Sequence, residues 1–380
     1  MDAKNSSMTV GIERVPEASV SASRSSISVA MATFNGLPYV EEQLKSILSQ
    51  SRPVQEVVIC DDKSTDGTWD WLSTACAADS RIRLYQNPKQ LGSTKNFERA
   101  IGLCHGDIIF LSDQDDIWLS EKVERLAAAL QTKDAVLAMS NGQLVKEDGE
   151  DIGVTLWDAN EIDQQIALGL QSTATFELLV RNRHFTGSAL CFKATIKELV
   201  TPIPAGVWHD QWIALIASLI APGQIKLLDE KLYCYRQHSG NQIGARLPTR
   251  IGLASSHSDG VAFLRKARKE IMSHEDIKTD VEFPIAAIQR VNWIIDHHPQ
   301  ILTTSSARHA LEMLQRWLNH STARCEFVEH RTPLRLAITR ERLQAYSEFS
   351  RGVSTVIRDI LIWLLYKGRS AKRNDSTDSS

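Results

Sequence analysis

Apolar runs and amphipathic segments alternate through the first 140 residues of the chain. Ile27–Thr33 is a short, almost continuous apolar run, which is the pattern of a buried strand. After the turn at Phe34–Pro38, the segment Glu41–Ser49 places Leu44 and Ile47 on one face of a helix. The same alternation continues along the chain. It predicts strands at 56–60, 81–85, 107–111 and 135–140, and helices around Trp69, at 93–103 and at 118–130.

Strands that alternate with helices predict a mostly parallel sheet flanked by helices, which makes the first part of the chain an α/β domain. In sheets of this kind, ligands bind outside the carboxyl ends of the strands. The loops that follow Thr33, Cys60 and Leu111 should therefore lie along one rim of the sheet.

The pattern changes after residue 161. Residues 163–180 and 207–221 have helical spacing, and residues 250–370 have the apolar spacing of helices without a sheet signal. Polar, Ser-rich segments at the two ends are typical of disordered tails. The sequence thus predicts a tail at 1–26, an α/β domain at 27–245, a mainly α-helical region at 246–370 and a second tail at 371–380.

Composition places the chain among ordinary globular proteins, with 43% hydrophobic and 23% charged residues. Its six cysteines include no CxxC pair, which argues against a disulfide scaffold or zinc ribbon and predicts reduced thiols. The N-terminal segment lacks the apolar stretch of a signal peptide, and no run reaches the ~18–20 apolar residues of a transmembrane helix. We therefore expect a cytoplasmic protein.

Charge is divided unevenly between the two parts of the chain. Residues 1–245 contain 22 basic and 31 acidic residues, whereas residues 246–380 contain 21 basic and 15 acidic residues. An acidic first part argues against nucleic-acid binding, which needs Lys and Arg for phosphate contacts. Acidic residues in a cleft can instead bind a divalent cation, and the cation can bind phosphates.

The segment Asp113-Gln114-Asp115-Asp116 directly follows an apolar run. Three carboxylates in four residues repel one another, so a bound cation would stabilise them, and oxygen ligands suit Mg²⁺ or Mn²⁺. The alternative is helix capping, which we assign to Asp116 at the start of the helix near Trp118.

Two other loops carry polar groups that a nucleotide could use. Asp61 and Asp62 follow the second strand, where a carboxylate could accept a hydrogen bond from a nucleobase imide, and Asp66 fits a helix cap. Lys95 and Asn96 begin a helix, whose first backbone N–H groups could meet a phosphate or a ribose. The alternative for this third segment is an ordinary helix start at the surface.

Three stretches together resemble the family-2 glycosyltransferases with the GT-A fold. They are SVAMATFNGLPYVEEQLKSILSQ, VVICDDKSTDGTW and NFERAIGLCHGDIIFLSDQDDIWLSEKVE. The SDQDDIW form, with the later WHDQWIALIA and YRQHSGNQIG, is similar to the bacterial rhamnosyltransferase-type branch, which builds cell-surface polysaccharides. The resemblance covers about residues 27–245. It implies a Rossmann-like GT-A domain that transfers a sugar from a nucleotide-diphosphate sugar to a hydroxyl with inversion.

The resemblance assigns roles on the donor side. In this family the first strand loop and the second strand contact the nucleotide, the first aspartate of a DxD motif faces the ribose or sugar, and the second faces a metal ion. A histidine of a later loop can contact the metal or the diphosphate. The residues at these positions, with the helix start described above, are Thr33, Asn35, Asp61, Asp62, Lys95, Asn96, Asp113 and Gln114 for the nucleotide sugar, and Asp113, Asp115 and His238 for Mg²⁺ or Mn²⁺.

On the acceptor side, the family places a catalytic base at the start of a later helix, commonly in a Glu-Asp pair. The pair here is His209-Asp210, which keeps the aspartate and changes its neighbour. Displacement with inversion needs a carboxylate to take the proton of the acceptor hydroxyl, so Asp210 is the predicted base. Helix capping is the alternative for Asp210, and the two roles can coexist. Trp208 and His209, with Thr186 and Gly187 of an earlier loop, are predicted to contact the acceptor.

The resemblance implies dTDP-rhamnose or a UDP-hexose as donor, and a growing cell-surface glycan or a lipid-linked glycan as acceptor. Two other classes compete. A sugar nucleotidyltransferase normally has a Gly-rich, basic loop after its first strand, whereas Phe34–Pro38 has one glycine and no basic residue. A non-catalytic scaffold that binds a membrane or partner would not need Asp113, Asp115 and Asp210.

Residues 346–373 have the pattern of a helix that lies on an anionic membrane surface. Val356, Ile360 and Leu364 share one helical face, and basic residues follow from Lys367 onwards. The alternative is an ordinary helix whose apolar face packs on the core. The lipid-linked acceptors of the family favour peripheral contact with the cytoplasmic face of a membrane.

Overall fold

The computed structural model describes residues 25–132, 134–181, 184–241 and 274–329, together with residues 345 and 349. The strands are β1 (Ile27–Thr33), β2 (Glu56–Asp61), β3 (Ile82–Gln86), β4 (Ile108–Ser112), β5 (Ile117–Trp118), β6 (Leu137–Lys146), β7 (Asp151–Thr155), β8 (Leu190–Lys193) and β9 (Ile225–Gln237). The α-helices are α1 (Leu37–Leu48), α2 (Thr68–Ala78), α3 (Ser93–Leu103), α4 (Lys122–Ala129), α5 (Leu156–Ala159), α6 (Gln164–Leu170), α7 (Thr175–Arg181), α8 (Lys197–Val200), α9 (His209–Ile220), α11 (His274–His297) and α12 (Thr304–Glu329). The 3₁₀ turns are η1 (Gly187–Ala189) and η2 (Ala194–Ile196).

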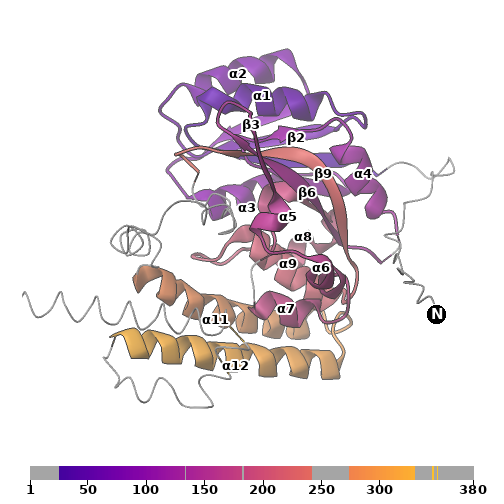
Figure 1. Cartoon of the computed structure of the whole chain (residues 1–380), viewed down its shortest axis with the longest axis vertical. Coiled ribbons are helices and arrows are strands. Elements are labelled where there is room, and N and C mark those ends of the chain that lie inside the picture. Colours follow the sequence, from indigo (N-terminus) through magenta and orange to yellow (C-terminus); the bar gives the residue numbers. More distant parts are fainter. Residues whose placement is uncertain are drawn as a thin grey trace, which may run out of the picture.

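One mixed sheet with helices around it forms the centre of the molecule (Figure 1). Its strand order is β3-β2-β1-β4-β8-β6-β9-β5, and β7 pairs with β6. The first four of these strands are parallel to one another, and β6 is parallel to β9. β8, β7 and β5 pair with their neighbours in the antiparallel direction. The predicted α/β class and mostly parallel sheet are confirmed.

The apolar runs identified in the sequence form the two-sided core of this sheet. In β1, Ile27, Val29 and Met31 on one face and Ser28 and Ala30 on the other are fully buried, as strands covered on both faces require. The amphipathic helix α3 buries Phe97 and Ile101 against the sheet, together with the polar residue Asn96. Burial of these apolar side chains is the main force that fixes the loops at the strand ends.

The loops after β1, β2 and β4 lie on one rim, as the sequence predicts. Thr33 pairs with Asp61 in the parallel register of β1 and β2, and Asp61 pairs with Gln86 of β3. On the other side of β1, Met31 pairs with Ser112 at the end of β4. Strands β1, β2 and β4 therefore end within two residues of one another in the register of the sheet, and the polar residues that follow them face a common space.

Three local predictions are wrong. The helix predicted at 118–130 begins at Lys122, because Ile117–Trp118 pairs with β9 as strand β5. Asp116 is therefore no helix cap: it is buried, and its Oδ1 accepts a hydrogen bond from the backbone N–H of Arg236, 3.2 Å away. The helix predicted at 163–180 is divided into α6 and α7 by a turn at residues 171–174, where the Ser172 hydroxyl donates to the Gly169 carbonyl.

The capping prediction for Asp66 is only partly right: the N-cap of α2 is Gly67, but Asp66 bonds to the first helical residue from one position earlier. Its Oδ1 accepts hydrogen bonds from the backbone N–H and the hydroxyl of Thr68, at 3.0 and 2.6 Å, at the start of α2. The strand predicted at 135–140 extends to Lys146, since its second half pairs with the long strand β9.

The helices α11 and α12 lie side by side at one end of the molecule, next to α7 and α9 (Figure 1). Phe283 of α11 contacts Trp212 of α9 and Trp317 of α12, with ring centroids 6.1 and 5.3 Å apart. Within the described ranges, no helix is both long and apolar enough to cross a bilayer. Several predictions concern residues outside the described ranges. They are the boundary at residue 245, residues 1–24 of the first tail, the second tail and nearly all of the membrane segment 346–373.

Glu56 at the start of β2 gives this sheet a pH-dependent contribution to stability. Burial alone would raise the pKa of Glu56, but hydrogen bonds from Ser28, the His105 backbone N–H and Arg83 outweigh it and lower that pKa to about 2. A carboxylate whose folded pKa lies below its ordinary value of 4.5 stabilises the fold above that value. The contribution is lost as the pH falls through about 2.

We therefore expect Glu56→Gln to lower the free energy of unfolding by about 1–3 kcal/mol at pH 7. The difference from the wild-type protein should shrink below pH 4.5 and vanish near pH 2, which denaturant unfolding across this range measures. Glu198→Gln, at an exposed position of α8, is the matched control and should have no effect. If the difference in unfolding free energy between Glu56→Gln and the wild-type protein stays the same from pH 7 to pH 2, the charge of Glu56 is not its cause.

Candidate active site

The acidic loop Asp113–Asp116 lies at the carboxyl end of β4. Burial raises the pKa of Asp113 well above its ordinary value, and the neighbouring carboxylates of Asp115, Asp116 and Asp210 raise it further. Lys122 acts in the opposite direction. Asp210 is almost 100 residues away in the chain, so its influence means that the fold brings the predicted base close to the DxD motif. A bound cation would relieve the repulsion within this group.

Asp115 and His238 meet across the rim. The Nε2 atom of His238 lies 2.8 Å from Oδ2 of Asp115, and the amide of Asn241 donates to the same oxygen at 3.4 Å. The ring of Tyr39 covers His238, with centroids 4.5 Å apart. Asp115 lies in the loop after β4, and His238 directly follows β9. These two strands are not neighbours in the sheet.

The donor atoms of Asp113, Asp115 and His238 suit a divalent cation. Carboxylate oxygens are ligands of Mg²⁺ or Mn²⁺, and the softer Mn²⁺ also accepts an imidazole nitrogen. Among the described residues, no three His, Cys, Asp or Glu side chains stand close enough to hold a metal ion by themselves. Mg²⁺ usually takes only one or two protein carboxylates and fills its shell with water and substrate phosphate. The residues present therefore fit a cation that binds together with a nucleotide diphosphate.

Arg236 fixes the acidic loop, and the sequence did not point to it. Its side chain is buried, and its guanidinium donates to the backbone carbonyls of Asp115 at 2.9 Å and Glu147 at 2.6 Å. It also donates to the carboxylate of Glu42 at 2.5 Å. The planar guanidinium can reach all three acceptors at once. Its place two residues before His238 in YRQHSG is the one signal that could have suggested a role.

Asp61 organises the first two loops of the rim. It is fully buried and accepts hydrogen bonds from the hydroxyls of Thr33 at 3.2 Å and Ser64 at 2.5 Å. Asn35 has a positive φ of 50° and joins the same loops: its backbone N–H donates to Ser64, and its side-chain oxygen accepts from the Thr65 N–H. The predicted nucleotide residues Thr33, Asn35 and Asp61 therefore lie together.

Gln114 ties the acidic loop to the loop after β1. Its amide accepts from the backbone N–H of Phe34 at 2.7 Å and donates to the Phe34 carbonyl at 2.9 Å. A Cβ on Gly36 would lie 2.2 Å from the Gln114 side chain, so this contact needs glycine. The Gln114 amide is thus engaged with the backbone, although the resemblance assigns Gln114 to the nucleotide sugar.

Asp62, Asn96 and Lys95 are engaged with protein groups. Asp62 accepts from the Asn87 side chain at 2.6 Å and from the backbone N–H groups of Leu91 and Gly92. Asn96 accepts from the same Asn87 amide and donates to the Cys60 carbonyl at 2.7 Å. The Lys95 ammonium donates to Glu98 and to the carbonyl of Ile203. This cluster holds the start of α3 against β2.

The predicted acceptor residues meet at the start of α9. Trp208 precedes the helix and Asp210 lies in its first turn, where helix dipoles favour a carboxylate. Within the described residues, neither ring nitrogen of His209 has a hydrogen-bond partner, although this ring is buried and stacked on Phe97 at 4.0 Å. A Cβ on Gly187 would lie 2.6 Å from His209 Nε2, so the η1 turn packs directly on this ring.

Thr186, the residue directly before the η1 turn, is held in place by a side-chain hydrogen bond. Its hydroxyl accepts a hydrogen bond from the Asn160 amide at 3.0 Å, which links the turn to the residue after α5. The structure thus brings Thr186, Gly187 and His209 into one group beside Asp210.

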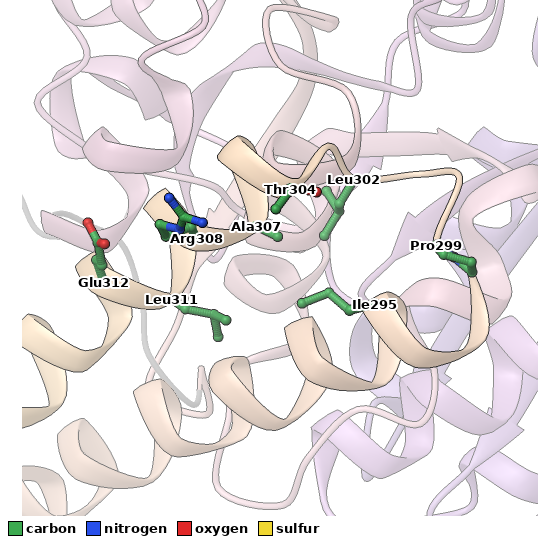
Figure 2. A pocket seen from close by; sticks show the side chains of 8 residues that line it. All are labelled: Ile295, Pro299, Leu302, Thr304, Ala307, Arg308, Leu311 and Glu312. Carbon is green, nitrogen blue, oxygen red and sulfur yellow. The ribbon is translucent and has the colours of Figure 1, made fainter.

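A separate hollow of about 460 Å³ lies between α11 and α12 (Figure 2). Ile295, Leu302 and Leu311 form its apolar wall, and Arg308 and Glu312 stand at one side. These residues all belong to the helical end of the molecule and are distant in the fold from the rim. The hollow therefore takes no part in the candidate active site.

The comparison with protein families agrees with this geometry. Residues 28–190 match the model of Glycosyl transferase family 2. That range contains the strands β1, β2 and β4, their loops and the acidic loop. Residues 28–190 are therefore similar to glycosyl transferase family 2, and the chain has the α/β architecture of the GT-A fold, as the resemblance implies.

Individual relatives are more distant. The chain is 28% identical over 228 residues to an uncharacterized glycosyltransferase of Nostoc sp., a match that covers 57% of this chain and 66% of the relative. It is 37% identical over 116 residues to the dTDP-rhamnosyl transferase RfbG of Shigella flexneri, which covers 29% of this chain and 40% of that protein. A crystal structure of S. aureus TarS in complex with UDP-GlcNAc aligns with a TM-score of 0.50 at 16% identity, covering 85% of this chain and 80% of that one.

These matches are partial. The chain spans about half to two thirds of the length of the curated relatives it matches. The likeness to TarS concerns the fold alone, because the sequence identity is low.

Proposed function

We propose that the chain transfers a sugar from a nucleotide-diphosphate sugar to a hydroxyl group, with inversion at the anomeric carbon, in the synthesis of a cell-surface glycan. The observation that carries the proposal is that Asp113, Asp115 and His238 lie at the carboxyl ends of the central strands and that the charge of Asp210, in the first turn of α9, acts on Asp113. Asp113, Asp115 and His238 suit the binding of a metal-bound diphosphate, and Asp210 suits the role of a general base. A transferase of this kind needs both, on opposite sides of the reacting sugar.

On the donor side, Asp115 and His238, with Asp113, are the residues that would hold a Mg²⁺ or Mn²⁺ ion. When bound, the ion stabilises the charge that develops on the diphosphate leaving group. Thr33, Asn35 and Asp61 shape the space for the nucleoside. Asp61 is already bonded to Thr33 and Ser64, so this part of the rim needs little rearrangement when a nucleotide binds.

On the acceptor side, Asp210 takes the proton of the attacking hydroxyl. It lies in the first turn of α9, where the helix dipoles interact favourably with a carboxylate. His209 offers two ring nitrogens without partners among the described residues, and burial lowers the pKa of this imidazole, so it is neutral at pH 7. A neutral imidazole both donates and accepts hydrogen bonds, but both nitrogens are buried and Gly187 packs on Nε2, so a sugar hydroxyl could reach the ring only after the η1 turn moves.

For the donor we propose dTDP-rhamnose, with a UDP-hexose as the second candidate. The similarity to the dTDP-rhamnosyl transferase RfbG supports the first. The test is a screen in which the full chain is incubated with dTDP-rhamnose, UDP-glucose, UDP-galactose and GDP-mannose, with Mg²⁺ or Mn²⁺, while release of the nucleoside diphosphate is measured. Release from one donor, abolished by a chelator, supports the proposal. No release and no binding with any of the four would contradict it.

A lipid-linked acceptor would require the enzyme to work at a membrane surface. We propose that residues 346–373 provide peripheral contact, on the strength of the apolar face and basic cluster in their sequence. Full-length protein should float with anionic vesicles, and a truncation after Ala345 should remain in the soluble fraction. Neutral phosphatidylcholine vesicles are the control and should recover much less protein. Equal flotation of the two proteins on anionic vesicles would contradict this proposal.

A further inference from the structure

Arg290 of α11 is buried where the helical region meets the α/β domain (Figure 1), and the proposed reaction gives it no role. Its guanidinium carbon lies 5.7 Å from the ring centroid of Trp212 in α9 and 5.1 Å from that of Trp293 in α11. Two aromatic rings therefore stabilise the cation. Arginine is seldom buried unless its N–H donors are paired, so the partners of these donors indicate what the residue is placed to do.

The Arg290 guanidinium binds two consecutive carbonyls of one segment. Its Nη1 donates to the backbone carbonyl of Thr201 at 2.8 Å, and its Nη2 donates to that of Pro202 at 2.6 Å. The planar fork of an arginine suits two adjacent acceptors, whereas a lysine ammonium acts as a single point charge. Thr201 and Pro202 begin the segment 201–208, which connects α8 to α9.

The first turn of α9 depends on the segment 201–208 for its position. Trp208 is the N-cap of α9, and its side chain makes no capping hydrogen bond within the part of the chain that the structure describes. A Ser, Thr, Asp or Asn side chain commonly fixes a helix start of this kind. Here the preceding segment has to do so, and Asp210 lies in the turn that it fixes.

Helix α3 of the α/β domain binds the later part of the same segment. The Thr94 hydroxyl donates to the Val207 carbonyl at 2.9 Å, and the Lys95 ammonium donates to the Ile203 carbonyl at 2.5 Å. The Glu98 carboxylate accepts a hydrogen bond from the Ile203 N–H at 2.5 Å. The segment is therefore attached at its end to the α/β domain through α3, and at its beginning to the helical region through α11.

We propose that Arg290 is a positioning residue that fixes the beginning of the segment 201–208 and thereby holds the first turn of α9, with Asp210, in place. The helical region then forms part of the acceptor half of the site. The role of Asp210 in this statement rests on the proposed function. The attachment of α9 through Arg290 is a property of the fold and is testable without any ligand.

Amide hydrogen exchange of the full chain tests this attachment. The reporter is the Trp212 N–H, which donates to the Trp208 carbonyl at 3.0 Å and so closes the first turn of α9. The internal reference is the Trp71 N–H, which closes the first turn of α2 on the Gly67 carbonyl at 3.1 Å. Arg290→Met removes both bonds to the segment and should speed exchange at Trp212 by about 10-fold relative to Trp71.

Arg290→Lys is the second variant, and it decides the question if Arg290→Met does not fold. Lysine keeps a cation near the rings of Trp212 and Trp293 but has no planar fork for two adjacent carbonyls. Exchange at Trp212 should therefore still be faster than in the wild-type protein, by about 3-fold.

Arg324→Met is the matched control. Arg324 of α12 is another buried arginine of the helical region, and its guanidinium donates to the Asp280 carboxylate of α11 at 2.9 Å. The variant removes this contact between α11 and α12 and leaves both bonds of Arg290 in place. Trp212 should therefore exchange at the wild-type rate.

Kinetics with the donor found in the screen test the consequence for the site. Arg290→Met should lower kcat for sugar transfer by about 10-fold and leave the donor KM unchanged, because a displaced base affects the chemical step and not donor binding. The rate is expressed per mole of enzyme that binds the donor, so that a loss of folded protein does not imitate the effect. Arg324→Met should have the wild-type kcat.

An unchanged exchange rate at Trp212 in the Arg290 variants would overturn the proposal. Equal acceleration in Arg324→Met would overturn it as well, since the cause would then be a general loosening of the helical region. Faster exchange with a wild-type kcat would show that Arg290 does not position the base. A wild-type chain that neither binds nor turns over a nucleotide sugar contradicts the proposed function instead, and the exchange rates still decide whether Arg290 holds the start of α9.

Discussion

Asp210→Asn should retain nucleotide-sugar binding and lose sugar transfer by about 10²-fold or more, the usual scale for a positioned general base. The substitution preserves the shape of the side chain and its hydrogen bond from the Gln211 N–H, which is 2.7 Å from Oδ1. It removes only the basicity. The loss should therefore appear in kcat, with little change in KM for the donor. Steady-state kinetics with the donor found in the screen measure both.

Asp70→Asn is the control for Asp210→Asn. Asp70 is also an aspartate in the first turn of a helix, α2, but it is exposed and stands apart from the acceptor group. It should transfer sugar at the wild-type rate. If Asp210→Asn does the same, the base lies elsewhere in the site. His209 would then be the next residue to change.

Asp115→Ala should abolish metal-dependent binding of the nucleotide sugar while the protein stays folded. The carboxylate of Asp115 lies against the imidazole of His238, so the substitution removes one of the predicted metal ligands. The fold should tolerate the loss, because the Asp115 charge raises the pKa of its buried neighbours Asp113 and Asp116 and is unfavourable without a cation. Calorimetric titration of the donor with and without Mn²⁺ measures the effect.

Asp148→Ala provides the comparison for this variant. Asp148 is exposed in the hairpin between β6 and β7, and its removal leaves the rim intact. It should bind the donor like the wild-type protein in the presence of Mn²⁺. Donor affinity in Asp115→Ala that equals the wild-type affinity, with and without a chelator, would disprove the metal-site assignment.

The rim could be predicted because its signals are local. The apolar runs of β1, β2 and β4 stand out in the sequence, and parallel strands bring their carboxyl ends to one edge of a sheet. Asp113 and Asp115 follow such a run directly. The long-range steps were to place Asp210 and His238 near them, and both steps depended on a family resemblance.

The residues that were missed act over long sequence distances. Arg236 bonds to the Asp115 carbonyl from 121 residues away, and Lys122 bonds to Ser188 from 66 residues away. In the sequence, Arg236 and Lys122 have the appearance of ordinary basic residues in a strand and at a helix start, and nothing near them in the chain indicates their partners. The strand pairing of Ile117–Trp118 was missed for the same reason, since it is set by β9 and not by local propensity.

The prediction for Gln114 shows a different limit. A polar residue in a motif has the same appearance whether it binds a ligand or the backbone. The pair of hydrogen bonds to Phe34 depends on the close approach of Gly36, which only the folded loops reveal.

The central claim is that this rim binds a nucleotide sugar through a divalent cation. Its most direct test is a calorimetric titration of the wild-type chain with dTDP-rhamnose and with UDP-glucose, in Mn²⁺ and then in excess EDTA. We expect saturable binding of one of these donors in Mn²⁺ and its loss in EDTA. Binding that is equally strong in EDTA, or no binding of either donor in Mn²⁺, would contradict it.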